Sequence, residues 1–108
     1  MEAKKKSIEI YHDSNGREPF TEWIKSISLR DRSRIFARLD RIESGNLGDY
    51  KSVSDGVYEL RFHFSSGFRV YYGEVNNKII LLLCGGDKSS QKKDVKKAKV
   101  YWKDFISR

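Results

Sequence analysis

The chain has little cysteine, proline or histidine, and it has no long apolar segment. It contains one cysteine, one proline and two histidines in 108 residues. The single cysteine, Cys84, excludes an intramolecular disulfide, and the charged N-terminus lacks the apolar stretch of a secretory signal. The longest uninterrupted apolar run, residues 79–84, has six residues, whereas a bilayer-spanning helix needs about 20. We therefore expect no membrane contact and a reducing, cytoplasmic environment.

Residues that bind metals or nucleotides do not occur at the spacings those ligands require. His12 and His63 are far apart, and neither belongs to a His-Glu-x-x-His or Cys/His pattern. The carboxylates are scattered among basic neighbours, which argues against a two-metal nuclease. Glycines in residues 83–89 lead toward a lysine and a serine, but the GxxxxGK[ST] spacing of a nucleotide-binding loop is missing. We expect neither a metal nor another cofactor.

Positive charge is what the chain has in excess. It carries 22 lysines and arginines against 15 aspartates and glutamates, a net charge of +7. The excess is concentrated in residues 87–108, which hold eight basic and three acidic side chains. A concentrated positive field attracts polyanions such as nucleic acids, and a well-solvated helix face is the alternative interpretation.

Length and hydrophobic periodicity predict one α+β domain, residues 1–108. At 38% hydrophobic residues, a chain of this size forms a single core without disulfides or metals. The periodicity predicts these elements: a strand over residues 7–12, a helix over 19–27, a helix between Ser28 and Gly45, a hairpin of 58–64 and 68–75, a strand over 78–84, and a helix capped by Ser89 or Ser90. The order β-α-α-β-β-β-α predicts that the helices, two N-terminal and one C-terminal, pack on one face of a small, mostly antiparallel sheet.

Two features of the helices bear on function. The second helix has an apolar side expected to be buried, formed by Ile35, Phe36, Leu39 and Ile42. Its arginines fall on or near the other side and are interpreted as a solvated or partner-binding face: Arg30, Arg34, Arg38 and Arg41. Trp23 and Trp102 recur on apolar helix stripes, which favours a packing role over base stacking.

Arg61 and Arg69 give the sharpest functional signal in the sequence. If their strands pair as a hairpin, both guanidinium groups emerge from the same sheet face, because side chains alternate with a period of two. The same face would carry Glu59, Tyr71 and His63. Cations on a rigid sheet suit the binding of RNA and the stabilisation of a charged phosphorane. The alternative is that Arg61 pairs with Glu59 or Glu74 and that the surface is an ordinary wet sheet face.

RNA can be cleaved without a metal because its 2′-hydroxyl is an internal nucleophile. A protein must align this hydroxyl with the phosphate, remove its proton and neutralise the developing charge. Arginine and lysine serve the charge, whereas proton transfer needs a group such as Tyr71, His63 or Lys88, among which the sequence does not choose. Lys88 also stands beside a helix N-terminus that could hold one phosphate. Equally, Asp87 or Ser89 could simply cap that helix.

Three motifs, taken in order, resemble the RelE/ParE toxin superfamily, specifically its HigB-like, phage-derived addiction module killer branch. The motifs are residues 56–61 (Gly-Val-Tyr-Glu-Leu-Arg), 67–72 (Gly-Phe-Arg-Val-Tyr-Tyr) and 81–91 (Leu-Leu-Leu-Cys-Gly-Gly-Asp-Lys-Ser-Ser-Gln), followed by Asp94, Ala98 and Tyr101-Trp102. The resemblance covers essentially the whole chain. It implies a compact sheet flanked by helices, and it implies the toxin of a type II toxin-antitoxin system.

The resemblance also implies activities and partners. RelE-like members cut mRNA in the ribosomal A site, which here implies a ribosome-dependent, metal-independent mRNA endonuclease that blocks translation. The alternatives are a ParE-like, non-enzymatic inhibitor of DNA gyrase and a non-toxic basic module that binds RNA or a partner. The implied partners are the ribosome, mRNA and a cognate antitoxin of helix-turn-helix, HigA-like type, through which operator DNA would be bound.

The resemblance assigns roles to particular residues. Arg61 and Arg69 match the strand arginines of the family, and Lys88 matches the lysine of its Gly-Gly-Asp-Lys segment. With Tyr71, these three are the catalytic candidates. The RNA-binding candidates are Gln91, Lys92, Lys93, Lys96 and His63. One departure is that RelE carries paired lysines before the hairpin, where this chain has only Lys51.

Overall fold

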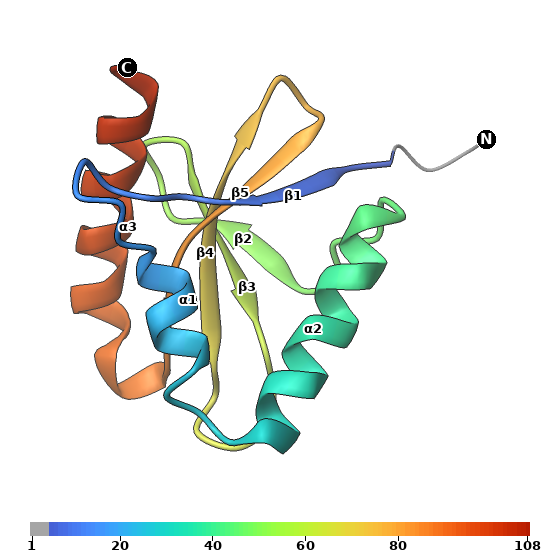
Figure 1. Ribbon diagram of the computed structural model, residues 1–108. Helices are drawn as coiled ribbons and strands as arrows, with labels where there is room; N and C mark the ends of the chain where they lie inside the picture. The colour runs from blue at the N-terminus through green and yellow to red at the C-terminus, as the bar shows by residue number, and fades with distance from the viewer. Residues whose placement is uncertain (1–4) are drawn as a thin grey trace.

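A computed structural model describes residues 5–108, and it confirms the α+β class. In chain order the elements are β1 (Ser7–Ile10), α1 (Pro19–Ile24), α2 (Leu29–Glu43), β2 (Tyr50–Ser52), β3 (Val57–Arg61), β4 (Arg69–Val75), β5 (Ile79–Gly86), a short 3₁₀ helix (Lys88–Ser90) and α3 (Gln91–Ile106) (Figure 1). The predicted element order is confirmed except for the additional strand β2. Within the described residues, no helix combines the length and the apolar character needed to cross a membrane.

The five strands form one sheet in the order β1-β5-β4-β3-β2. The pairings β2–β3, β3–β4 and β4–β5 are antiparallel, and only β1 and β5 run parallel. The prediction of a mostly antiparallel sheet is therefore confirmed. The sequence did not reveal β2 because all of its residues, Tyr50–Ser52, are exposed and show no alternation of apolar and polar side chains.

Helices cover both faces of the sheet, so the prediction that all of them lie on one face is wrong. α1 and α2 share one core with the sheet, formed by Phe20, Ile24, Ile35, Leu39, Ile42, Leu60, Phe62, Phe68, Val70, Tyr72, Ile80 and Leu82. α3 packs on the other face, over Tyr11, Val57, Tyr71, Leu81, Leu83, Cys84 and Ala98. The reason lies in β4 and β5, which carry apolar side chains on both faces and need a cover on each.

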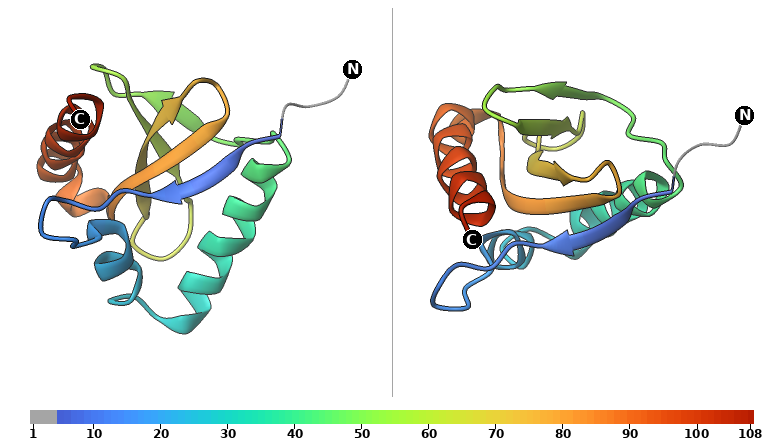
Figure 2. Two further views of the ribbon diagram at one scale, coloured as in Figure 1. Left: turned by 45° about the horizontal axis from the view of Figure 1, so that its top comes forward. Right: turned by 90° about the horizontal axis from the view of Figure 1, so that it is seen from above.

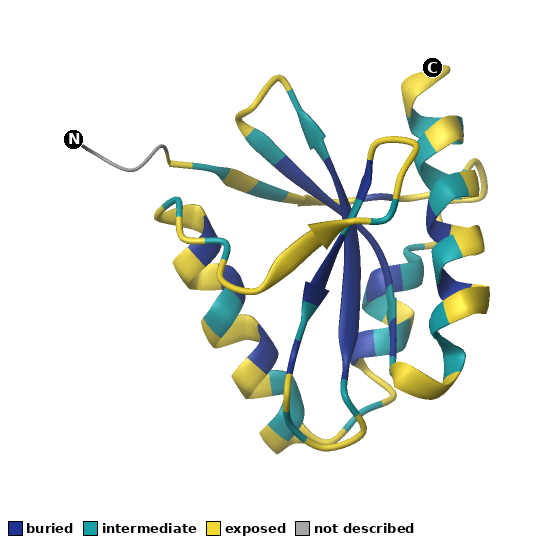
Figure 3. Cartoon of the chain, turned by 180° about the vertical axis from the view of Figure 1, so that it is seen from behind, coloured by how far each residue is buried: buried dark blue, intermediate teal, exposed yellow. Residues whose placement is uncertain are grey.

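The figures show how this arrangement positions the surface. α2 and α3 lie on opposite sides of a strongly twisted sheet (Figures 1 and 2). The central strands are buried, whereas β2 and the outer sides of α2 and α3 are exposed (Figure 3). Lys51 of β2 and several lysines of α3 line one groove at this side of the molecule.

The helices largely follow the sequence pattern. Ser28 caps α2 as predicted, because its hydroxyl oxygen accepts a hydrogen bond from the backbone N–H of Asp31 at 3.1 Å. Phe36 is 44% exposed, so its expected burial is wrong; it is about 100° around the helix from buried Ile35 and lies beyond the sheet. α1 ends at Ile24, three residues earlier than predicted.

Two tryptophans pack directly on glycines of the sheet, which confirms their predicted packing role. A Cβ atom on Gly73 would lie 2.2 Å from the ring of Trp102 on α3. A Cβ atom on Gly85 would lie 2.2 Å from the ring of Trp23 on α1. Because real contacts of this kind are far longer, each helix requires a strand position without a side chain.

We expect Gly73→Ala to lower the free energy of unfolding by about 1–3 kcal/mol, because the added methyl group forces Trp102 out of its position. Urea unfolding measures the change. Ser33→Ala, at an exposed position of α2, is the control and should stay within about 0.5 kcal/mol of the wild type. Equal unfolding midpoints for Gly73→Ala and the wild type would contradict this packing.

Candidate nucleic-acid interface

A buried carboxylate lies at the centre of the predicted site. Glu59 on β3 is completely buried and faces α3. Its Oε1 atom accepts a hydrogen bond from Nε of Arg61 at 3.2 Å and lies 3.8 Å from Nε of Arg69. Its Oε2 atom accepts a hydrogen bond from Nε2 of Gln91 at 2.9 Å. Glu59 therefore ties β3, β4 and the first turn of α3 together.

The two arginines share a face, but they differ in exposure. Arg61 stands opposite Arg69 in the register of β3 and β4, so the predicted common face is confirmed. The alternative in which Arg61 pairs with Glu59 is also observed, because the two side chains form an ion pair at 3.2 Å. The side chain of Arg61 is 32% exposed, whereas that of Arg69 is only 8% exposed. Nη1 of Arg69 donates hydrogen bonds to the carbonyl oxygens of Gly67 and Phe68. The expectation that both guanidinium groups are open to solvent is wrong for Arg69, because Glu59 and this turn hold it inside.

Tyr71 lies in the core, which contradicts its expected place among exposed catalytic groups. Its side chain is completely buried under α3. Its hydroxyl group makes no hydrogen bond to any of residues 5–108. Burial, with smaller contributions from Glu59 and Asp94, raises the pKa of the phenol. Tyr71 therefore has no contact with solvent through which it could exchange a proton with a substrate.

Asp87, one of the two residues offered as a cap beside Lys88, caps the short 3₁₀ helix, and Ser90 stands at the N-cap of α3 without a capping hydrogen bond from its side chain. The carboxylate of Asp87 accepts hydrogen bonds from the backbone N–H groups of Ser89 and Ser90, at 2.9 and 3.3 Å. The hydroxyl group of Ser89, followed by these backbone groups, holds the pKa of Asp87 below its usual range. The protein's own carboxylate thus occupies the helix N-terminus, where the sequence allowed a phosphate. This settles the two alternatives in favour of capping.

Lys88 is exposed and lies next to Arg69. Both residues lie against Gly67. A Cβ atom added to Gly67 would be 3.5 Å from Cβ of Lys88 and 3.5 Å from Nη1 of Arg69. An adjacent hollow is lined by Lys88, Ser89, Ser90, Gln91, Lys92 and Lys93. Lys88 and Lys93 therefore extend the positive surface from the buried arginine toward α3.

A lysine-rimmed groove runs between β2 and α3, with a volume of about 430 Å³. We call it the lysine groove; it is lined by Lys51, Val53, Glu59, Gln91, Lys92, Val95, Lys96 and Lys99. The predicted residues Gln91, Lys92 and Lys96 thus come together here. Lys99 was not predicted, although its spacing from Lys92 and Lys96 places all three on one side of α3. Lys51 joins them from the edge strand.

A second groove, of about 330 Å³, lies beside Arg61. We call it the arginine groove; it is lined by Arg34, Ala37, Arg38, Arg41, Asp49, Arg61, Phe62, His63 and Phe64. His63 lies here, separate from the lysines with which the sequence grouped it. Its Nε2 atom is 2.5 Å from Oδ2 of Asp49, a residue that the sequence did not single out. Arg61 therefore lines the arginine groove, and the Glu59 carboxylate that it contacts lines the lysine groove.

The α2 arginines do not form one solvated face. Arg38 is half-buried and donates hydrogen bonds to the carbonyl oxygens of Leu47, Asp49 and Arg61. Burial lowers the pKa of its guanidinium. Arg34 and Arg41 are exposed, as predicted. Arg38 is instead a structural residue that fastens the loop after α2 to the end of β3.

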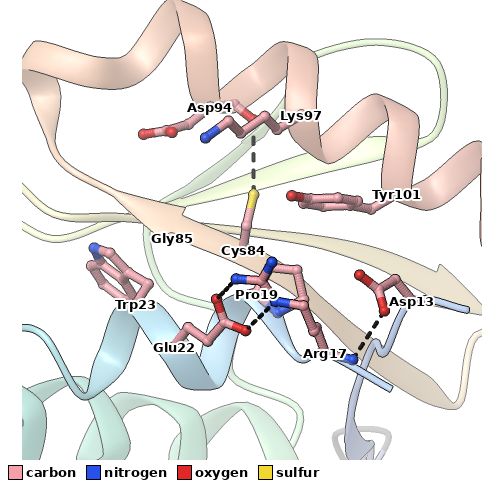
Figure 4. A pocket seen from close by; sticks show the side chains of 10 residues that line it. All are labelled: Asp13, Arg17, Pro19, Glu22, Trp23, Cys84, Gly85, Asp94, Lys97 and Tyr101. Atoms are coloured by element: carbon pink, nitrogen blue, oxygen red, sulfur yellow. Dashed lines mark hydrogen bonds and ion pairs between the residues drawn. The ribbon is translucent and has the colours of Figure 1, made fainter. Parts of the chain in front are cut away.

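A further pocket, of about 490 Å³, lies between α1 and α3 over the end of β5 (Figure 4). Its charged side chains are three carboxylates and two cations: Asp13, Glu22, Asp94, Arg17 and Lys97. Cys84 at its base is 5% exposed, and burial raises the pKa of its thiol to about 12. This confirms the predicted core role of Cys84. The positive surface is therefore at the two grooves beside Arg61 and not at this pocket.

Fold and surface together define a small basic α+β protein whose exposed cations suit a polyanionic partner. Residues 22–103 match the family described as phage derived protein Gp49-like (DUF891), and the chain belongs to this family. It is also 48% identical over 82 residues to an uncharacterized protein of Haemophilus influenzae, a match that covers 75% of this chain and 83% of the relative. The Gp49-like family is associated with toxin-antitoxin addiction modules, in which a toxin is paired with an antitoxin.

We expect Glu59→Ala to lower the free energy of unfolding by about 3–5 kcal/mol, because it leaves Arg69 buried without its carboxylate partner. Urea unfolding provides the measurement. Glu22→Ala is the matched control: it removes a carboxylate that pairs with Arg17 on the surface, and it should cost at most about 1 kcal/mol. Similar losses in the two variants would show that the Glu59 network is not a structural centre.

We expect Tyr71→Phe to leave the free energy of unfolding unchanged or to raise it by up to about 1–3 kcal/mol, because the buried hydroxyl group lacks a partner. Tyr11→Phe should instead lower it by about 1.5–3 kcal/mol, since that hydroxyl group donates a 2.6 Å hydrogen bond to Asp104. Thermal or urea unfolding distinguishes the two. Destabilisation of equal size in both variants would argue against an unpartnered Tyr71.

Proposed function

We propose that this protein is the toxin of a toxin-antitoxin pair and that it blocks translation by cutting mRNA on the ribosome, as RelE-like toxins do. The observation that carries the proposal is the position of Arg61, a partly exposed cation that lines the arginine groove and is held by a buried carboxylate of the lysine groove. Membership of the Gp49-like family supports the toxin role.

The lysine groove supports the binding of RNA. The groove is lined by four lysines and by one carboxylate, that of Glu59, which already pairs with Arg61. The lysines are Lys51, Lys92, Lys96 and Lys99. Lysines arranged along a groove contact successive phosphates, and the release of counterions drives binding. The apolar floor formed by Val53 and Val95 offers contact to base or sugar surfaces. This combination suits a single strand better than a small anion.

Arg61 supports the chemistry of the proposal. Cleavage at a phosphate passes through a species with extra negative charge, and a preorganised cation stabilises it most. Glu59 fixes Arg61 by a 3.2 Å hydrogen bond while about a third of the side chain stays exposed. Arg69, buried behind it, shares the charge of Glu59 with Arg61, so two cations face one carboxylate and a net positive charge is left to attract a phosphate. In this proposal Arg69 is a positioning residue.

A cognate antitoxin is the second proposed partner. A toxin whose active surface is basic is blocked most directly by an acidic segment that covers it. We propose that the antitoxin, of the helix-turn-helix type, covers the lysine groove and competes with RNA there. Its gene would lie next to that of the toxin.

We expect the purified protein to cut translated messages in a cell-free extract, and Lys92→Ala/Lys96→Ala to reduce cutting about tenfold, equivalent to about 1.4 kcal/mol of binding. Primer extension on the message measures the cuts. Lys25→Ala/Lys78→Ala is the matched control: both lysines are exposed and outside the grooves, so the net charge falls by the same amount. Cutting by this control should equal that of the wild type.

Three outcomes would contradict the proposal in different ways. Intact messages together with growth arrest would overturn the nuclease activity, and inhibited supercoiling by purified gyrase would then indicate ParE-like action. An equal loss of cutting in Lys92→Ala/Lys96→Ala and in the control Lys25→Ala/Lys78→Ala would show that the lysine groove has no special role. Growth without arrest when the chain is expressed alone would contradict the toxin role itself.

A further inference from the structure

The arginine groove contains an exposed histidine paired with a carboxylate. Nε2 of His63 lies 2.5 Å from Oδ2 of Asp49, and the two side chains are 71% and 47% exposed. The hydrogen bond from His63, followed by the charges of His63, Arg61 and Arg38, holds the pKa of Asp49 below its usual range. An ionised carboxylate only accepts, so the hydrogen lies on Nε2 of His63 and leaves Nδ1 as an unprotonated base in the neutral ring.

Hydrogen bonds from Arg38 and from the backbone of Arg61 hold the Asp49–His63 pair in place. The guanidinium group of Arg38 donates to the backbone carbonyl oxygens of Asp49 and Arg61, so it joins the loop that carries Asp49 to the end of β3. It also lies over the ring of Phe62, 4.6 Å from the centroid. The backbone N–H of Arg61 donates to the carbonyl oxygen of Asp49 at 3.0 Å. The loop and the strand end therefore keep a fixed distance, which fixes Asp49 in front of His63.

Cations that can hold a phosphate surround this pair. The guanidinium group of Arg34 lies 3.8 Å from the centroid of the Phe64 ring. Neither Arg34 nor Arg41 pairs with a carboxylate among residues 5–108. Arg61 contributes from β3. A phosphate seated between these groups would lie beside His63.

We propose that His63 is the general base of RNA cleavage and that Asp49 is its positioning residue; this inference rests on the proposed nuclease function. His63 accepts the proton of the 2′-hydroxyl group through Nδ1, and the 2′-oxygen bonds to the adjacent phosphorus. The bond from phosphorus to the 5′-oxygen breaks, and this oxygen takes a proton from water. The imidazolium returns its proton to the resulting hydroxide. The products are a 2′,3′-cyclic phosphate and a 5′-hydroxyl end.

The geometry distinguishes His63 from the other two candidates for proton transfer, because Lys88 lines a separate hollow and not the arginine groove. Tyr71 is completely buried. His63 is exposed, oriented by a carboxylate and located in the same groove as Arg61. The charged groups facing it are Arg34, Arg38 and Arg41 from α2, Asp49 from the loop and Arg61 from β3. Four cations and one anion favour the approach of a phosphate.

The test is steady-state cleavage of mRNA on programmed ribosomes at several pH values. We expect His63→Gln to lower kcat by about 10²–10⁴-fold, with KM changed less than threefold, because Arg61 and the lysines remain. A general base acts only in its unprotonated form, so wild-type cleavage should fall as the pH is lowered. His63→Gln should show no such fall. Asp49→Asn should lower kcat by a larger factor than the factor by which it raises KM.

His12→Gln is the matched control, because it replaces the other histidine of the chain, which lines neither groove. It should keep the wild-type rate and pH profile. Circular dichroism checks that each variant is folded, as expected for exposed positions. If folded His63→Gln cuts within threefold of the wild type with the same pH profile, the role of His63 is overturned and the nuclease function stands. If the wild type leaves messages intact, both are overturned.

Discussion

The burial of the Glu59 carboxylate is the constraint on which the surface depends. A carboxylate inside a protein is tolerated only where donors and cations surround it. Here Arg61, Arg69 and Gln91 provide them, from β3, β4 and α3. Because β3, β4 and α3 carry Arg61, Arg69 and the helical lysines, one buried charge sets the positions of these cations relative to one another.

The same network explains how two arginines can stand opposite each other in a sheet. Like charges on directly paired strand positions repel, and Arg61 and Arg69 are such a pair. Glu59 lies against both and offsets the repulsion. The result is asymmetric: Arg69 is enclosed, and Arg61 remains at the surface, where it lines the arginine groove. In the proposed function, one groove holds the strand and the other carries the chemistry.

Several features could be read from local patterns, and others could not. The common face of Arg61 and Arg69 follows from a period of two, and the cap of α2 by Ser28 follows from a spacing of three residues. The burial of Arg69 and Tyr71 depends on α3, which crosses their face from the far end of the chain. The pair of Asp49 and His63 joins residues 14 positions apart at the open end of the β2–β3 hairpin, and no periodic signal marked β2.

The sequence by itself determined the fold class, the central strand pattern, the basic character of residues 87–108 and the family resemblance, because each of these resides in composition or local spacing. The tertiary structure alone decided which cations stay exposed and that α3 covers the second face of the sheet. The physical reason is that exposure and charge pairing depend on which distant elements come together, whereas periodicity reports only the side on which a residue lies.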